Sequence, residues 1–344
     1  MSASAETTHM YQEAAAGAQA VREQLQLDAA TVALIGERLR TLAPRIVITC
    51  ARGSSDHAAT YAKYLLETHT GVVVSSASPS VSSVYGVAQD LRGCLFIAIS
   101  QSGRSPDLLA TVRAATKAGA TVIALCNDAQ APLVEAAEFF VPLRAGPELS
   151  LAATKSYIAT LAALARLVAA WTGSGALQTS IERLPELLDR GWSLDWSAAL
   201  PVLRHAEHLY VVGRGFGLGL AQEVALKCKE TCALHAEAFS SAELRHGPLT
   251  LLGAAFPALV FAQNDATKPG VDALIAELTG RDLPVLVAGT AASGGIVLPA
   301  LDCPAETAPI VLVASAYKLL ATLALQRGVD PDRPPHLKKL TATV

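Results

Sequence analysis

The sequence predicts an α/β protein built from two similar parallel sheets, each flanked by helices. Short apolar runs alternate with longer helical segments, which is typical of strands that are buried on both faces of a sheet. The pattern occurs twice: Val47 is matched by Val211 and Ile97 by Leu259, at separations of 164 and 162 residues. A near-constant separation indicates that one α/β unit has been duplicated.

Composition and charge agree with this fold class. The 344-residue chain is 51% hydrophobic but only 5% aromatic, and it is long enough for two domains with separate cores. The formal net charge is −3 and no basic block occurs. We therefore expect neither a nucleic acid nor a membrane surface as partner.

The first half should contain one complete unit. Residues 10–43 are expected to form one or two helices before the first strand. Apolar runs bounded by Gly, Ser and Asp turns predict strands at 45–50, 72–76, 95–99, 121–126 and 139–143. Helices are expected at 57–70, in the stretch that ends at 118, and at 153–172.

The second half repeats this order after a boundary. Residues 173–200 begin with Gly-Ser-Gly and are only weakly helical, so we expect a linker. Strands follow at 208–212, 256–262, 284–288 and 296–298, with helices at 218–233, 270–280 and 309–327. The expected domains are an N-terminal helical segment (1–44), subdomain 1 (45–172), the linker (173–200), subdomain 2 (201–327) and a tail (328–344).

The sequence also bears on compartment. The N-terminus lacks a basic region followed by an apolar stretch, so we expect no signal peptide. The longest apolar run, 158–171, is interrupted by Arg166, so we expect no membrane span. The six cysteines form no C-x-x-C pair, which favours reduced thiols and a cytoplasmic location.

Neither a metal nor a cofactor is expected. His235 and His246 are too isolated to form a metal-ligand set. Gly213-x-Gly-x-Gly217 follows a strand, but its third glycine is spaced wrongly for a dinucleotide fingerprint.

A serine-rich turn, Ser100–Asp107, leaves one predicted strand and opens a helix. Ser105 is placed as N-cap, with Pro106 at the first helical position. Hydroxyls beside free N–H groups at a helix N-terminus can bind a phosphate, and Ser54 and Ser55 could complete the cradle from a similar turn. The alternative is a turn that only caps its helix.

The stretch from Ala221 to Leu249 carries most of the ionisable chemistry. It is expected to begin as a helix and end in a loop. Glu223, Lys227 and Glu230 recur at i, i+4 and i+7 and so share one helical face. Glu230 with His246 would suit proton transfer beside a sugar carbonyl. The alternative is a salt-bridged helix face, with the pairs Glu223–Lys227 and Lys227–Glu230, beside a loop histidine.

Five ordered motifs resemble the sugar isomerase (SIS) family, and more narrowly the isomerase half of glucosamine-6-phosphate synthase. They are Ser100-Gln-Ser-Gly103, Ala153-Thr-Lys155, Ala225–Glu230, His235-Ala-Glu237 and Glu243–Pro248. The resemblance covers about residues 40–344. It implies two SIS subdomains, a phosphosugar substrate and a homodimer, because in the synthase the histidine loop serves the neighbouring subunit.

The resemblance also implies residue roles. Glu230 would be the base between C1 and C2, His246 would open the sugar ring, Lys339 would reach C2 of the keto form, and Lys227 would support Glu230. The implied phosphate ligands are Ser55, Ser100, Gln101, Ser102 and Ser105. Gly53, Ser54 and Ala153 would lie at the sugar, although the synthase has serine at the last position.

Two departures from the synthase shape the expected reaction. About forty residues precede the first strand and Ser2 follows Met1, so we expect no glutamine-hydrolysing domain. Arg104 replaces the acid of the synthase, and the Ser-Gly-Arg-Ser-Pro form looks like stand-alone SIS deaminases of amino-sugar catabolism. The expected activity is deamination of glucosamine 6-phosphate to fructose 6-phosphate and ammonia. Open alternatives are action on galactosamine 6-phosphate or fructosamine 6-phosphate, ammonia-dependent amination, and a non-catalytic phosphosugar-binding regulator.

Overall fold

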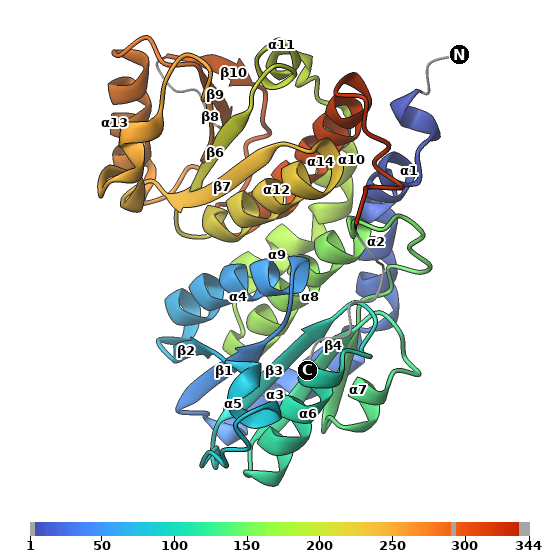
Figure 1. Ribbon diagram of the computed structural model, residues 1–344. Coiled ribbons are helices and arrows are strands. Elements are labelled where there is room, and N and C mark those ends of the chain that lie inside the picture. The colour runs from blue at the N-terminus through green and yellow to red at the C-terminus, as the bar shows by residue number, and fades with distance from the viewer. Residues whose placement is uncertain (1–3, 290–293, 337–344) are drawn as a thin grey trace. The chain divides into compact units, whose positions relative to one another are not determined.

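The computed structural model describes residues 4–289 and 294–336, and contacts divide the chain into two compact units, each built around one sheet (Figure 1). Residues 19–147 and 156–182 form what we call the first sheet unit. The second sheet unit consists of the described residues of 4–18, 148–155 and 183–336. The N-terminal helix α1 (His9–Ala15), preceded by η1 (Ala5–Thr7), therefore belongs to the second sheet unit.

The first sheet unit contains a five-stranded sheet of order β2-β1-β3-β4-β5, in which all neighbouring strands are parallel. Its strands are β1 (Ile46–Cys50), β2 (Val73–Ser76), β3 (Leu95–Ser100), β4 (Thr121–Cys126) and β5 (Phe139–Pro142). Its helices are α2 (Gly17–Leu27), α3 (Ala29–Leu42), α4 (Ser54–Thr70), α5 (Pro79–Ser83), α6 (Pro106–Lys117), α7 (Pro132–Glu135), α8 (Lys155–Thr172) and α9 (Gly175–Glu182).

Both faces of this sheet are buried, which explains why its central strands are mostly apolar. On one face, Phe96 and Ala98 of β3 pack with Leu108 and Val112 of α6. On the other face Ile97 is fully buried, and Figure 1 shows α4 and α8 on that side. Each large apolar side chain buried in this way contributes about 1.5–3 kcal/mol. The burial holds β3 in the middle of the sheet, with its carboxyl end at the edge.

The second sheet unit contains a five-stranded parallel sheet of order β10-β9-β8-β6-β7. Its strands are β6 (His208–Gly213), β7 (His235–Ser240), β8 (Ala258–Ala262), β9 (Val285–Gly289) and β10 (Ile296–Leu298). Figure 1 shows α12 (Gly217–Cys232) and α14 (Ala308–Gln326) on one face and α13 (Lys268–Thr279) on the other. The remaining helices and turns are α10 (Leu184–Ser193), α11 (Leu200–Leu203), η2 (Ser197–Ala199), η3 (Glu243–Arg245) and η4 (Pro248–Leu251).

The strand orders confirm the predicted duplication. The first sheet has the order β2-β1-β3-β4-β5, and the second, taken from its β7 edge, has the order β7-β6-β8-β9-β10. Each strand of the first sheet thus has the same place in its sheet as the strand five positions later in the chain. The α/β fold class with two duplicated parallel sheets is therefore confirmed.

Two local predictions were wrong. The segment after α12 is not all loop, because His235–Ser240 form strand β7, parallel to β6. The duplication could have predicted β7, because its counterpart β2 lies about one repeat length earlier in the chain. The N-terminal segment forms three helices rather than one or two. The break before α3 falls at Asp28, whose carboxylate accepts hydrogen bonds from Arg144 at 2.8 and 3.1 Å.

The most apolar helix is α14, not the run at 158–171 that the sequence singled out. Among the described residues it alone is long and apolar enough to cross a membrane, with a mean hydropathy of 1.8. However, 83% of this stretch is buried inside the protein. Packing against α10 and α12 explains its composition, as expected for a core helix.

Candidate functional site

The serine-rich turn lies at the point where the strand order of the first sheet reverses. β1 is hydrogen-bonded to both β2 and β3, so the chain leaves the carboxyl ends of β1 and β3 in adjacent loops. In open α/β sheets this switch point is where ligands bind. The Ser100–Asp107 turn and the turn at 51–56, which carries Ser54 and Ser55, therefore follow neighbouring strands.

Ser100 and Gly103 shape the turn after β3. The backbone N–H of Gly103 donates to the Ser100 hydroxyl at 2.9 Å, inside the buried base of the loop. Gly103 has a φ of +63°, and a Cβ there would lie 2.6 Å from the Ala131 side chain and 2.8 Å from the Cys126 sulfur. Only glycine satisfies both the dihedral angle and the space. Ser100 therefore organises the turn.

An ion pair ties the two loops together. Arg52, after β1, donates to Asp107 in the first turn of α6 through Nε at 3.0 Å and Nη2 at 2.8 Å. The Asp107 side chain is only 1% exposed, and its other oxygen accepts the N–H of Leu108 at 2.8 Å. Sequence reasoning missed this pair. An arginine recurs one repeat length later as Arg214, and this recurrence could have pointed to Arg52.

The turn leaves donors unpaired where an anion would bind. Ser105 occupies the N-cap position of α6, but its side chain makes no capping hydrogen bond. Within the described residues, the hydroxyls of Ser55, Ser102 and Ser105 have no polar partner in the protein. Two helices of 17 and 12 residues, α4 and α6, begin here, and their N-termini favour negative charge. We call this arrangement the serine cradle.

Arg104, in the same turn, is paired with a carboxylate. Its guanidinium forms an exposed ion pair with Asp128 at 2.7 Å, so it already has a carboxylate partner in the protein. The pKa of Asp128 is lowered chiefly by this hydrogen bond and next by the Gln130 N–H.

The corresponding loop of the second sheet unit is filled by its own carboxylate. Gly215 has the same φ of +56° as Gly53, so the turn is preserved. Yet Asp265 accepts the N–H of Thr267 at 2.7 Å and the Gln263 amide at 2.5 Å, at the start of α13. A carboxylate in that position repels a second anion. Among the described residues, this difference explains why the corresponding loop of the second unit does not present an open cradle.

The acidic face of α12 forms one buried network. The Lys227 ammonium lies 3.2 Å from the Glu223 carboxylate and 2.6 Å from that of Glu230. The side chains of Glu223 and Lys227 are 0% and 1% exposed, whereas that of Glu230 is 18% exposed. The Tyr317 hydroxyl of α14 donates to Glu223 at 2.8 Å. Of the three charged side chains, Glu230 is the one that solvent or a ligand can reach.

Electrostatics keep this network charged. Burial lowers the pKa of Lys227, but the Glu223 and Glu230 carboxylates outweigh that effect, and the net result is a raised pKa. The Lys227 ammonium, protonated at neutral pH, donates to the Glu230 carboxylate at 2.6 Å. Both ion pairs of the alternative interpretation, a salt-bridged helix face, are present, and two of the three groups are buried. Lys227 is placed to position Glu230.

The other predicted residues lie at separate places. His246 follows η3 in an exposed turn, and its side chain has no polar partner among the described residues. Ala153 lies in the loop before α8, and Gly53 opens α4 with open space beside its Cα. Ser54 has a polar partner within the protein. Lys339 lies outside the described residues.

The loop that carries Ala153 is shaped by two buried carboxylates that sequence reasoning missed. Glu13 of α1 accepts the N–H groups of Leu149 and of Ser150, the latter at 3.1 Å. Glu148 accepts the N–H of Thr154 at 2.9 Å. The signal was a glutamate on the apolar face of α1, where Met10 and Ala14 are also buried.

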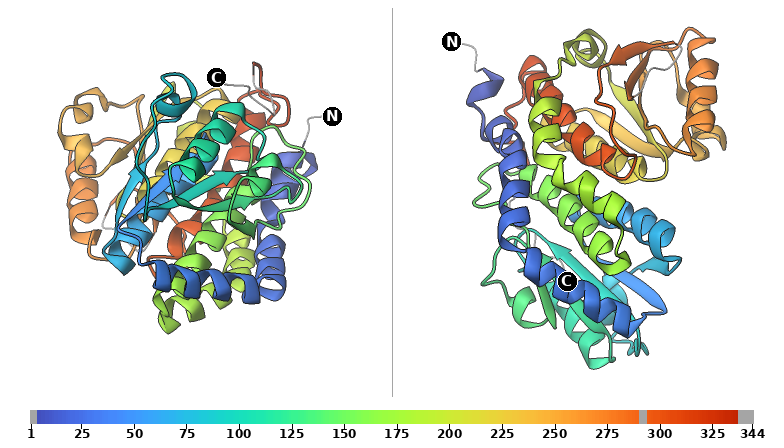
Figure 2. Two further views of the ribbon diagram at one scale, coloured as in Figure 1. Left: turned by 90° about the horizontal axis from the view of Figure 1, so that it is seen from below. Right: turned by 180° about the vertical axis from the view of Figure 1, so that it is seen from behind.

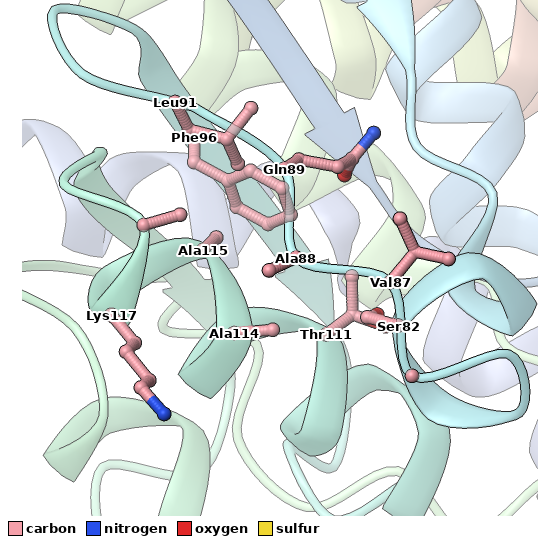
Figure 3. Close-up of a pocket in the computed structure, with 12 residues that line it drawn as sticks. Ser82, Val87, Ala88, Gln89, Leu91, Phe96, Thr111, Ala114, Ala115 and Lys117 are labelled. Atoms are coloured by element: carbon pink, nitrogen blue, oxygen red, sulfur yellow. The ribbon is translucent and has the colours of Figure 1, made fainter.

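One hollow of the first sheet unit is separate from the serine cradle. A cavity of about 350 Å³ lies between α6 and the segment that follows α5 (Figure 3). Phe96 and Leu91 form apolar walls, and the Ser82 hydroxyl donates to Thr111 at 3.1 Å. None of the predicted site residues lines it. Among the described residues no three His, Cys, Asp or Glu side chains are grouped as metal ligands.

Known proteins share both the sequence and this architecture. The SIS domain matches residues 42–170 and 202–327. A glutamine–fructose-6-phosphate aminotransferase (isomerizing) from Thermotoga maritima is 31% identical over 327 residues, covering 88% of this chain and 52% of that protein. The chain thus spans about half the length of the curated relatives it matches.

Two solved structures are similar over nearly their whole length. A provisionally assigned phosphosugar isomerase from Silicibacter pomeroyi DSS-3 has 38% identity and a TM-score of 0.91, covering 94% of this chain and 100% of that chain. The C-terminal domain of glucosamine-fructose-6-phosphate aminotransferase from Francisella tularensis has 25% identity and a TM-score of 0.83, covering 95% and 98%. Since the matched segments cover both sheets, the chain belongs to the SIS domain family.

Proposed function

We propose that this chain is an isomerising deaminase of an amino-sugar phosphate, with glucosamine 6-phosphate as substrate and fructose 6-phosphate and ammonia as products. The observation that carries the proposal is Glu230, a partly exposed carboxylate held by a buried lysine. A general base needs a fixed position and access to its substrate, and this carboxylate has both. The serine cradle supplies the anion-binding chemistry that a sugar phosphate requires.

In the proposed reaction, His246 assists ring opening by moving a proton from the anomeric hydroxyl to the ring oxygen. Glu230 removes the C2 proton from the open aldehyde, giving an enolamine, and returns it to C1. The resulting C2 imine adds one water and loses ammonia, which leaves the C2 ketone. One water is consumed and one ammonia is released, so the equation balances. Lys227 holds the Glu230 carboxylate during both transfers.

Replacing the base gives the sharpest test. Glu230→Gln keeps the size of the side chain and should lower kcat by about 10²–10⁴-fold, the usual effect of losing a positioned general base. Glu186→Gln, an exposed glutamate on α10, is the matched control and should leave kcat unchanged. Circular dichroism checks that both variants fold. Near-normal ammonia release by Glu230→Gln would sink the proposal.

A substrate panel separates this proposal from its neighbours. Ammonia and ketose 6-phosphate are measured together for glucosamine, galactosamine and fructosamine 6-phosphates. Glucosamine 6-phosphate should give both products in equal amounts. The reverse mixture, fructose 6-phosphate with ammonia, tests the aminating direction, which the likeness to aminotransferases named isomerizing favours. Binding of a sugar phosphate without turnover would indicate a regulator.

We further propose a homodimer in which His246 serves the partner's site. Support comes from its exposed turn, where its side chain has no polar partner among the described residues. Mixing inactive Glu230→Gln and His246→Ala proteins should then restore activity, because each hybrid dimer regains one complete site. In a two-fold dimer about one quarter of all sites would be complete. No recovery after subunit exchange would show that each chain uses its own histidine.

We also propose a cytoplasmic location. All six cysteines are free thiols, which a reducing compartment preserves. Cell fractionation tests this, and recovery of the chain from an oxidising compartment would contradict it.

A further inference from the structure

A buried arginine in the first sheet unit has no role in the proposed reaction. Arg166 lies on α8 and is only 4% exposed, surrounded along the helix by fully buried apolar residues. A charge in such a place is costly unless an opposite charge or hydrogen bonds compensate it. Among the described residues, the positive charge of Arg166 is only partly compensated by hydrogen bonds and opposite charge.

The carboxylate that partly offsets the burial of Arg166 is already shared. Asp28 is the carboxylate that acts on Arg166, but both of its oxygens accept hydrogen bonds from Arg144, at 2.8 and 3.1 Å. Nη1 of Arg166 has no hydrogen-bond partner in the part of the chain that the structure describes. Burial lowers the pKa of Arg166 and Asp28 partly opposes this, but arginine stays protonated at neutral pH. Two guanidinium groups thus depend on one buried carboxylate.

Arg166 lines a cavity of about 310 Å³. The cavity lies between α2, α3, α8 and α9, and Figure 2 shows α3 running beside α8. Lining side chains that would contact a ligand are Arg40, Arg166, Gln178, Leu25, Val32 and Ala170. A volume near 300 Å³ is at the lower end of the range for small-molecule sites.

The walls determine the kind of ligand. Arg40 is a second cation, but its Nη1 donates to the backbone carbonyls of Ala170 and Trp171, so part of its capacity is used. Glu37 is exposed at the lining and would oppose a highly charged ligand. One guanidinium whose Nη1 lacks a hydrogen-bond partner among the described residues, beside apolar walls, matches a planar monoanion better than a phosphate dianion.

We propose that this cavity binds a small organic carboxylate, with the carboxylate at Arg166 and an apolar body against Leu25 and Val32. The site differs from the serine cradle in place and in chemistry. The cradle lies at strand ends and offers hydroxyls and N–H groups, whereas this cavity lies between helices and offers a guanidinium. The inference does not depend on the proposed deaminase activity.

The test uses the purified full-length protein and isothermal titration calorimetry. Benzoate and isovalerate are the probes, benzamide and isovaleramide are the uncharged counterparts, and inorganic phosphate is the anion control. Each is titrated to about 10 mM, enough to detect a dissociation constant near 1 mM. At least one carboxylate should bind, and its amide should not.

Variants locate the binding. Arg166→Met keeps the apolar stem and should weaken carboxylate binding about 10- to 100-fold, as expected for a lost charge-assisted hydrogen bond. Arg113→Met, at an exposed position of α6, should change nothing. Ala33→Phe fills the cavity from an exposed position of α3 while every charge stays, so it keeps the test valid if Arg166→Met fails to fold.

Several results would overturn the proposal. They are the absence of binding by either carboxylate, equal binding of carboxylate and amide, and unchanged binding in both Arg166→Met and Ala33→Phe. Stronger binding of phosphate than of the carboxylates, lost in the same two variants, would also reject it and assign the cavity to a phosphorylated ligand.

Discussion

Replacing Lys227 with methionine probes the network that holds the proposed base. Methionine keeps most of the length and the apolar stem of the side chain but removes the ammonium group. The Glu223 and Glu230 carboxylates then face each other without a cation, and Glu223 is fully buried. The variant should therefore be much less stable than the wild-type protein, and its proposed activity should fall because Glu230 loses its fixed position.

The magnitude follows from two distances. With an effective dielectric constant of about 20, attractions across 3.2 and 2.6 Å amount to about 5 and about 6 kcal/mol. Dehydration of the buried charges costs several kcal/mol per ion and offsets most of this. Removing one partner of a buried ion pair therefore typically costs about 3–5 kcal/mol, which is the loss we expect for Lys227→Met.

Urea unfolding followed by circular dichroism measures the loss. Lys268→Met is the matched control, because Lys268 and Asp272 form an i, i+4 pair at 2.6 Å whose side chains are 24% and 39% exposed. Such exposed pairs contribute about 0–1 kcal/mol. Adding Glu223→Gln to Lys227→Met removes the stranded carboxylate and should recover about 1–3 kcal/mol.

The pH dependence has a definite sign. Because the folded-state pKa of Lys227 is raised above 10.5, its contribution is fully present below pH 10.5 and is lost as pH rises through the folded value. Wild-type stability should thus fall more steeply above pH 10.5 than that of Lys227→Met. If Lys227→Met costs no more than Lys268→Met, the reasoning about a buried network is refuted.

Two further predictions concern other buried groups. Glu13→Ala leaves the N–H groups of Leu149 and Ser150 without their acceptor. It should therefore lower the free energy of unfolding, measured by chemical denaturation, by about 2–4 kcal/mol, whereas Glu13→Gln should lower it less. Equal losses in the two variants would contradict this account. Burial raises the pKa of Cys50 from 9.0 to about 12, so stability should fall by about 1.4 kcal/mol per pH unit between these values and not below pH 9. Between pH 9 and 12, the melting temperature of Cys50→Ala should decline less steeply than that of the wild-type protein. Identical slopes for the two proteins would disprove this account of Cys50.

Much of the fold could be predicted because its signals are local. Strands such as β3 and β4 are apolar at nearly every position, with Ser100 and Thr121 as the exceptions, because they are buried on both faces. β7 was not predicted from the sequence because five of its six residues, including His235 and Glu237, are exposed or half-buried, and only Ala236 is buried. The three N-terminal helices were also difficult, because the break at Asp28 depends on a partner 116 residues away.

The candidate site divides in the same way. Spacing along the chain predicted that Glu223, Lys227 and Glu230 share a helical face, because helical periodicity is a property of sequence. It could not predict that Glu223 and Lys227 are buried while Glu230 stays accessible, since burial depends on α14 and its Tyr317 packing against α12. The serines after β3 were visible in the sequence. The sequence did not show that the corresponding loop of the second unit is blocked to an anion, because Asp265 accepts the Thr267 N–H at the start of α13. Local pattern thus determined which elements and residue types occur, and tertiary packing decided which polar groups are left available for a ligand.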